Sequence, residues 1–276
     1  MGRCGVKTPI NNFHIAYDDH GAGQPIVFLH AFPLNRHMWE GDIQSLLTAE
    51  DTRGRFRLVA LDWPGFGESD IINTISPLEE FADIVAQLME TLGMRQAILC
   101  GLSMGGYAAF AFLRKYPQRL SGLILADTRP GADTPEARVN RENVAKIAMT
   151  EGTEAIANMQ LPRLISEYTR QHEPQVETRL RQMINEATSQ GIAAASLGMA
   201  QRLDSTALLA GIQVPTLVIV GEQDALTPPD VARAYAQQIP NSQLVVIPHV
   251  GHISNMEQPE AFLQAVRNFL HNWYSP

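Results

Sequence analysis

Seven short, mostly apolar runs recur along the chain, and they constrain its fold more than any other feature. The first, residues 13–17, alternates apolar and polar positions and is followed by a turn-like stretch at 18–23. The other six are nearly continuous in apolar character: 25–30, 56–62, 97–103, 123–127, 215–222 and 243–248. Continuous apolar strands are typical of a parallel sheet that is covered on both faces. Helical spacing of apolar residues between the runs fits this arrangement, at 77–92, 104–116, 230–238 and 257–269.

One region departs from this rhythm, because residues 128–202 contain no strand-like run. Prolines and glycines divide the region into several short helical stretches. It lies between two predicted strands, so we expect an insertion that forms a cap on a single α/β domain. The predicted division is an α/β core of residues 1–127 and 203–276 and a helical cap of residues 128–202. A length of 276 residues suits this organisation.

Composition narrows the range of partners and compartments. The net charge of −8 gives no electrostatic footprint for nucleic acid and disfavours docking on an anionic membrane. Two cysteines, Cys4 and Cys100, cannot form a disulfide framework, and Cys100 lies in an apolar run where a buried free thiol is expected. No secretory signal and no run of 18 apolar residues is present. We therefore expect a cytoplasmic protein without a membrane span; the sequence carries no signal for an oligomeric state.

The segment 101–105, Gly-Leu-Ser-Met-Gly, has the pattern G-x-S-x-G between a predicted strand and a predicted helix. A strand that turns sharply into a helix presents Ser103 at the tip, and small flanking residues relieve the crowding. The start of the helix also offers unpaired N–H groups to a developing negative charge. The pattern alone also occurs in glycine-rich turns with a bystander serine, but the strand-to-helix context favours a nucleophile.

A serine nucleophile needs a base, and the base needs an acid that orients it. In this architecture the three follow the chain order serine, acid, histidine, and sites form at the carboxyl ends of parallel strands. Asp224 follows the run 215–222, and His252 follows the run 243–248. Both are therefore predicted at the same rim of the sheet as Ser103.

Three other residues compete for these roles by position. Asp127 also ends a strand, Glu222 lies two residues from Asp224, and His249 lies three residues from His252. A loop aspartate or histidine is more often solvated or structurally hydrogen-bonded than catalytic. The joint placement of Ser103, Asp224 and His252 on three strand ends favours that set.

An oxyanion hole requires a second backbone N–H beside that of Met104. The run 25–30 ends in the turn 30–35, His-Ala-Phe-Pro-Leu-Asn, which is predicted at the same rim and makes the Phe32 N–H the expected second donor. Pro33 has no N–H and stiffens the turn. A rigid loop in which His30 is only structural is the alternative interpretation.

The chain resembles the α/β-hydrolases, and among them the small esterases, lactonases and cofactor-free haloperoxidases. The resemblance is carried by the segments HAFP (30–33), DWPGFGES (62–69), GLSMGG (101–106), GEQDALTPP (221–229) and HVGHISNMEQPE (249–260). It implies a mostly parallel, eight-stranded sheet with helices on both faces and a helical cap. The turn HAFPLN with Met38 and Trp39 is most similar to 3-oxoadipate enol-lactonases. We therefore count Trp39, with Phe32 and Met104, among the expected substrate contacts.

The resemblance implies that Ser103 is the nucleophile, Asp224 the acid and His252 the base. The serine distinguishes this chain from related dehalogenases and epoxide hydrolases, which carry an aspartate at this position. Carbon–carbon bond hydrolases share a similar elbow but usually have a glycine-rich oxyanion turn. Here Ala31 occupies a position where the family often has glycine, a departure that bears on the geometry of that turn.

The expected function is a serine hydrolase that cleaves a small ester, lactone or thioester through an acyl-enzyme, with no metal and no cofactor. The cap should exclude bulk water and select an apolar portion of the substrate. Methionines at 149, 159, 183 and 199 either line that pocket or pack between cap and core. Two alternatives stay open: a perhydrolase or haloperoxidase that uses the same residues, and a ligand receptor on a hydrolase scaffold.

Overall fold

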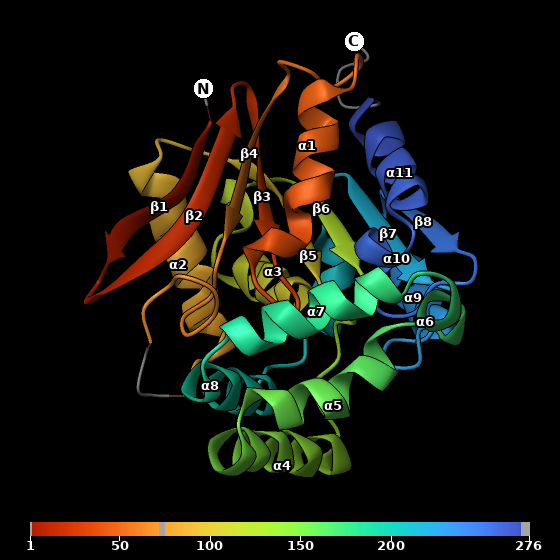
Figure 1. Cartoon of the computed structure of the whole chain (residues 1–276). Coiled ribbons are helices and arrows are strands. Elements are labelled where there is room, and N and C mark those ends of the chain that lie inside the picture. Colours follow the sequence, from red (N-terminus) through yellow and green to blue (C-terminus); the bar gives the residue numbers. More distant parts are fainter. Residues whose placement is uncertain (1, 72–74, 272–276) are drawn as a thin grey trace.

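Eight strands form one sheet in the order β1-β2-β4-β3-β5-β6-β7-β8 in a computed structural model that describes residues 2–71 and 75–271 (Figure 1). The strands are β1 (Arg3–Ile10), β2 (Phe13–Gly21), β3 (Gln24–Leu29), β4 (Phe56–Leu61), β5 (Ala97–Leu102), β6 (Leu120–Ala126), β7 (Thr216–Gly221) and β8 (Ser242–Ile247). Only the pairings of β1 with β2 and of β2 with β4 are antiparallel. The predicted fold class, a mostly parallel eight-stranded α/β sheet, is confirmed.

Five of the apolar runs, 25–30, 56–62, 97–103, 123–127 and 215–222, correspond to the interior strands β3, β4, β5, β6 and β7. Every residue of β5 and of β7 is buried, because helices cover both sides of the central strands. The strand β8 lies at an edge of the sheet and is only partly buried. Burial on both faces thus explains why the central runs lack the alternation of a half-exposed strand.

Two features of the amino-terminal part differ from the sequence prediction. The strand β1 carries no continuous apolar run, because it lies at the other edge of the sheet and most of its residues are exposed. The predicted turn at 18–23 is mostly strand, since β2 extends to Gly21 and pairs with β4. An ion pair of 2.7 Å between Asp19 and Arg57 spans these two strands. The polar residues predicted as a turn are therefore strand residues, and Asp19 among them pairs with a charged residue on the neighbouring strand.

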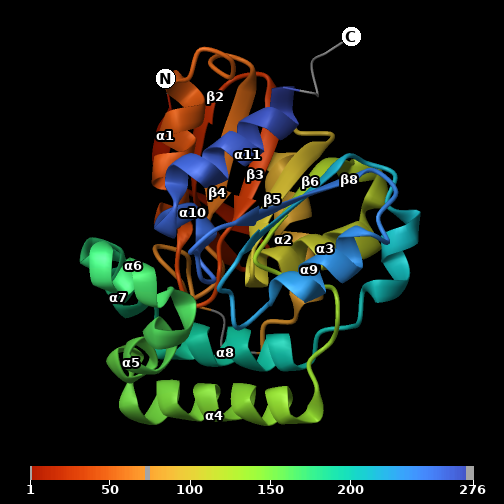
Figure 2. The same ribbon diagram turned by 90° about the vertical axis from the view of Figure 1, so that its right-hand side faces the viewer.

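Helices cover the two faces of the sheet in separate sets. On one face lie α1 (Glu40–Thr48), α10 (Ser254–Glu257) and α11 (Pro259–His271), and on the other lie α2 (Leu78–Thr91), α3 (Met104–Lys115) and α9 (Pro229–Ala236) (Figure 2). Each of the four predicted helical stretches contains a helix, with ends shifted by a few residues. The stretch 257–269 is divided, because Pro259 has no N–H to continue the hydrogen-bonding pattern of α10.

Five helices lie between β6 and β7: α4 (Pro135–Glu151), α5 (Thr153–Leu164), α6 (Glu167–His172), α7 (Pro174–Glu186) and α8 (Ser189–Ala200). They lie together beyond the carboxyl ends of the parallel strands (Figures 1 and 2). We call them the cap helices; the division of the chain at residues 128 and 202 stays a prediction. Shorter 3-10 helices occur at η1 (Arg36–Trp39), η2 (Pro117–Arg119) and η3 (Thr206–Gly211).

Both cysteines are free thiols in this fold, Cys4 exposed and Cys100 buried in β5. Burial raises the pKa of the Cys100 thiol well above its ordinary value. Cys100 is therefore protonated and packs as an apolar side chain. Within the described residues, no helix is both long enough and apolar enough to span a membrane.

The cap meets the core where two glycine backbones pass close together. A Cβ atom on Gly191 of α8 would lie 2.5 Å from the carbonyl oxygen of Gly65. The same carbonyl accepts two hydrogen bonds of 2.9 Å from Thr188, one from its N–H and one from its hydroxyl. Gly65 itself has a φ of 80°, as expected for a glycine in this turn. The start of α8 is thus held against the core at backbone distance.

We expect Gly191→Ala to lower the free energy of unfolding by about 1–3 kcal/mol, because the added methyl group forces the two backbones apart. The matched control is Gly41→Ala in α1, where a Cβ atom would meet nothing within 4 Å. That control should be neutral or should stabilise by up to about 1 kcal/mol, since alanine has the higher helix propensity. Urea denaturation of both variants tests this, and a Gly191→Ala variant as stable as wild type would contradict the contact.

Candidate active site

Ser103 lies at the sharp turn between β5 and α3, with a φ of 53° that is rare for a residue other than glycine. Its N–H donates to the carbonyl of Ala126 at 2.9 Å. A Cβ atom on Gly105 would lie only 2.0 Å from the carbonyl oxygen of Leu29. Only glycine therefore allows α3 to approach β3 closely enough for this turn. The structure agrees with the strand, turn and helix predicted from G-x-S-x-G.

Ser103, His252 and Asp224 form one continuous hydrogen-bonded chain. The Ser103 Oγ lies 2.8 Å from His252 Nε2, and His252 Nδ1 lies 2.7 Å from Asp224 Oδ2. A carboxylate beside Nδ1 favours the tautomer with its proton on that nitrogen, which leaves Nε2 free to accept the hydroxyl proton. His252 and Asp224 are both buried. The structure thus brings together the three residues expected from the sequence.

The carboxylate of Asp224 is held by its own loop. Its Oδ1 accepts backbone N–H groups from Leu226 and Thr227, at 2.8 and 2.9 Å. Its Oδ2 accepts the hydroxyl of Thr227 at 2.5 Å in addition to the bond with His252. We did not predict a role for Thr227, although it lies within the segment GEQDALTPP. Its position three residues after Asp224 could have indicated this contact, because short polar side chains commonly form hydrogen bonds within such turns.

Electrostatics in this buried chain favour the charged forms of both groups. Burial lowers the pKa of the His252 imidazole, but the charge of Asp224 and its hydrogen bond outweigh burial, so the pKa lies above its ordinary value. Burial likewise raises the pKa of the Asp224 carboxyl, and the charge of His252 and the hydrogen bonds from His252 and Thr227 reverse that effect. Asp224 is thus ionised and able to stabilise a protonated His252.

The competing candidates have other partners. Asp127 accepts hydrogen bonds from the N–H of Gly221 at 2.9 Å and from the N–H and hydroxyl of Ser254 at 3.1 and 2.5 Å. The Glu222 carboxylate accepts the N–H of His249 at 3.0 Å. Neither His249 nor Glu222 is hydrogen-bonded to the serine. Across residues 2–71 and 75–271, no group of three or more histidine, cysteine, aspartate or glutamate side chains is arranged to hold a metal.

The turn after β3 is fixed by His30. Its Nδ1 donates to the carbonyl of Ala31 at 2.9 Å, and its Nε2 accepts the N–H of Trp63 at 3.0 Å. Burial lowers the pKa of His30 to about 3, so the ring is neutral. These contacts agree with the interpretation of His30 as a structural residue that holds the turn rigid. Ala31 is accommodated in this turn, where its N–H lies 3.3 Å from the sulfur of Met38.

Two N–H groups near Ser103 are available as donors. Within the described part of the chain, the Phe32 N–H has no hydrogen-bond partner. Met104 is the first residue of α3, so its N–H precedes the first intrahelical acceptor. Phe32 lines the same cavity as Ser103. These are the two donors expected from the sequence for an oxyanion.

A cavity of about 210 Å³ opens over Ser103 and His252 between the core and the cap. Its wall includes Phe32, Tyr107 and residues of α4, α5 and α8. Of the four cap methionines only Met199 lines it, and Met149 is exposed. The side chains of Trp39 and Met104 do not reach it: Trp39 is fully buried in the core, with its ring centroid 5.3 Å from that of Phe28.

The cavity wall corrects the expectation of an apolar pocket. Its apolar members are Phe32, Ala137, Val144, Leu164, Met199, Ala225 and Leu226, but its polar and charged members are Tyr107, Arg129, Asp133, Asn140, Arg141, Gln160 and Arg163. Most of the polar members belong to the cap. No pattern in the sequence marks these residues, and only the packing of the cap over the core shows that they line the cavity.

The arrangement is suited to nucleophilic attack on a carbonyl group. A serine hydroxyl and the base that is hydrogen-bonded to it line a cavity, an ionised acid lies behind the base, and two N–H donors are available at the turns after β3 and β5. These are the components that acyl transfer requires.

A family model described as alpha/beta hydrolase fold matches residues 24–259. A thermophilic esterase from Thermogutta terrifontis, solved with malate bound, is 46% identical with a TM-score of 0.91, covering 98% of this chain and 99% of that one. The enol-lactonase from Burkholderia xenovorans LB400 is 29% identical with a TM-score of 0.87, covering 96% and 99%. A 2-hydroxy-6-oxononadienedioate/2-hydroxy-6-oxononatrienedioate hydrolase of Burkholderia vietnamiensis is 28% identical over 93% of this chain and 90% of its own length.

Proton transfer from Ser103 requires a neutral His252, so kcat/KM for a neutral ester should rise with pH. Because Asp224 raises the pKa of His252, we expect the midpoint of this rise above 6.5. In Asp224→Asn the negative charge that raises the pKa of His252 is lost, while the burial that lowers it remains, so the midpoint should move to lower pH. Measuring kcat/KM from pH 4 to 9 for both proteins tests this. A variant midpoint equal to or above that of wild type would contradict the electrostatic role of Asp224.

Proposed function

Because this chain belongs to the alpha/beta-hydrolase fold family, we propose that it is a serine hydrolase that cleaves a small carboxylic ester, lactone or thioester through an acyl-enzyme. The observation that carries the proposal is the buried hydrogen-bonded chain from Ser103 through His252 to Asp224 at the floor of a cavity. Similarity to an esterase at 46% identity and to an enol-lactonase at 29% supports ester and lactone carbonyl groups as targets.

In the proposed first step, Ser103 Oγ attacks the carbonyl carbon while its proton moves to His252 Nε2. The negative charge of Asp224 stabilises the imidazolium that forms. The carbonyl oxygen becomes an oxyanion and accepts hydrogen bonds from the N–H groups of Phe32 and Met104. In other hydrolases one such donor contributes about 10²–10³-fold to kcat.

The tetrahedral intermediate then collapses. The bond to the leaving oxygen or sulfur breaks, and the leaving group takes the proton from His252 Nε2. The acyl group stays on Ser103 as an ester. A water molecule, deprotonated by His252, attacks this ester and releases the acid and the free serine. The cap helices limit the access of bulk water to the cavity, which strengthens the electrostatic interactions inside it.

Ser103 is expected to react with a fluorophosphonate probe. Intact mass should increase by one adduct, and peptide mapping should place the adduct on Ser103. The variant Ser103→Ala should not be labelled and should lose several powers of ten in kcat. Steady multiple turnover of a small ester by wild type would exclude a receptor that only keeps the site. Labelling that persists in Ser103→Ala would refute the assigned nucleophile.

The acid is tested by comparing Asp224→Asn with Asp127→Asn. The first change favours the wrong imidazole tautomer, and in the serine protease triad it lowers kcat by roughly 10⁴-fold. Asp127 instead accepts hydrogen bonds from Gly221 and Ser254, and within the described chain no hydrogen bond joins it to His252, so it does not select the imidazole tautomer. Asp127→Asn should therefore cost about tenfold or less. We would measure kcat on one ester, with circular dichroism to confirm folding; the reverse order of effects would move the acid to Asp127.

A further inference from the structure

Three arginines line the cavity above Ser103, namely Arg129, Arg141 and Arg163. Among the described residues that line it, Asp133 is the only acidic one. The whole chain carries a net charge of −8, so this excess of positive charge is local to the cavity and opposite in sign to the protein. A site that concentrates positive charge attracts a ligand of negative charge.

Asp133 organises the cluster. Its side chain is fully buried, and its carboxylate pairs with Arg129 Nη2 at 3.0 Å, Arg141 Nε at 3.2 Å and Arg202 Nη1 at 2.6 Å. Burial raises the pKa of Asp133, but the charges of Arg141 and Arg202 outweigh burial, so its pKa lies below the ordinary value. One ionised carboxylate thus holds three guanidinium groups in place, and the cluster has more positive than negative charge.

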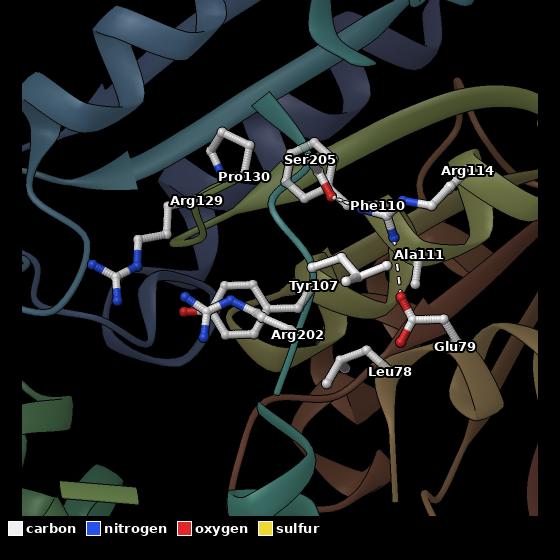
Figure 3. A pocket seen from close by; sticks show the side chains of 11 residues that line it. Leu78, Glu79, Tyr107, Phe110, Ala111, Arg114, Arg129, Pro130, Arg202 and Ser205 are labelled. Atoms are coloured by element: carbon white, nitrogen blue, oxygen red, sulfur yellow. Dashed lines mark hydrogen bonds and ion pairs between the residues drawn. The ribbon is translucent and has the colours of Figure 1, made fainter. Parts of the chain in front are cut away.

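One of these arginines has a structural role. Arg202 donates from Nε and Nη2 to the carbonyl of Gly131 and from Nη1 to the carbonyl of Met199. Its guanidinium lies over the Tyr107 ring, 4.2 Å from the ring centroid. Figure 3 shows both side chains in the view of an adjoining pocket. Each of its donor nitrogens is therefore engaged within the protein, and Arg202 fixes the position of Asp133 and Tyr107.

The arginines that line the cavity keep donors free. Arg129 and Arg141 each direct a single nitrogen to Asp133, and the Arg129 Nε is buried without a partner among the described residues. Within residues 2–71 and 75–271, Arg163 takes part in no side-chain hydrogen bond or ion pair. Guanidinium groups with unused donors bind planar anionic oxygens through paired, charge-assisted hydrogen bonds.

A neutral polar group in the same wall is also without a partner. The side chain of Gln160, at the cavity face of α5, is only 7% exposed and forms no hydrogen bond within the described chain. Its amide is therefore available to a polar group that enters the cavity. Gln160 and the three arginines, which we call the polar wall, thus line the same cavity.

We propose that this wall binds a carboxylate carried by the substrate, so that the natural substrate is a small ester or lactone of a carboxylate-bearing acid. The inference rests on the proposed function, because it concerns the part of the substrate that lies away from the carbonyl group attacked by Ser103. A cavity of about 210 Å³ must hold both the reacting carbonyl and the carboxylate, which favours a short chain between them. Half-esters of dicarboxylic acids have this chemistry.

The test compares two methyl esters of matched length, monomethyl glutarate and methyl pentanoate, which differ in a terminal carboxylate against a methyl group. We expect kcat/KM to be at least about tenfold higher for monomethyl glutarate, chiefly through a lower KM, because hydrogen bonds to charged groups are the stronger class. Ser103-dependent hydrolysis with equal or reversed preference would overturn the inference and leave the proposed function intact. Hydrolysis that persists in Ser103→Ala would instead overturn the proposed function.

Variants locate the effect. Arg163→Gln, at an exposed position without an internal partner, should lower the preference ratio at least about fivefold, and Arg141→Gln should lower it further. The matched control is Arg138→Gln, which lies on α4, is exposed and does not line the cavity. The control should keep the wild-type ratio. A ratio that falls equally in the control and in Arg163→Gln would contradict the assignment.

Binding is measured without turnover through protection of Ser103. Glutarate should slow fluorophosphonate labelling of wild type, and the protection should weaken in Arg163→Gln but not in Arg138→Gln. Glutaramide, the neutral analogue, should protect less. Stronger protection by inorganic phosphate than by glutarate would overturn the choice of carboxylate, and equal protection by glutaramide would overturn an anion site altogether.

Discussion

The contact between Gly105 and the end of β3 sets the geometry on which the site depends. A Cβ atom at this position would lie 2.0 Å from the Leu29 carbonyl oxygen, so α3 packs against the end of β3 at a distance that leaves no room for a side chain. Leu29 is followed directly by the turn that carries Phe32, and Gly105 follows the residue that carries the other N–H donor. The same close contact therefore positions the serine at its strained turn and brings the two donors beside it. Parallel pairing of β3 with β5 keeps both strand ends at one edge of the sheet.

Much of this arrangement could be predicted from the sequence because it depends on short segments. The central strands and the edge strand β8 all appear as apolar runs, and the elbow, the acid loop and the histidine loop each follow one of them. The edge strand β1 could not be found in this way, since its residues are mostly exposed and its pairing with β2 is what makes it a strand. Thr227 was also missed, because its contact with Asp224 depends on the fold of the loop.

The character of the cavity could not be predicted, because it arises from residues distant in sequence. Asp133 meets Arg202 across nearly the whole cap region, and no local pattern relates the two. The arginines of α4 and α5 lie on weakly amphipathic helices, whose sequence does not show which face is buried. A charged residue on such a helix is usually exposed to solvent. Trp39, in contrast, was expected to contact substrate because it lies close in sequence to the oxyanion turn. In the structure it packs against Phe28 and Phe262 in the core.

Hydrogen bonds join the cap region to the histidine loop and to α10, which follows that loop. The N–H of His252 donates to the carbonyl of Leu164 at 2.9 Å, and the buried Glu257 carboxylate accepts the N–H of Ser166 and the hydroxyl of Thr169. The end of α5 therefore serves as part of the support for the base. For protein engineering, this means that the insertion is not an interchangeable module. A chimera that replaces these helices with those of a relative must keep the segment from Leu164 to Thr169, or it loses the acceptor that holds His252 in place.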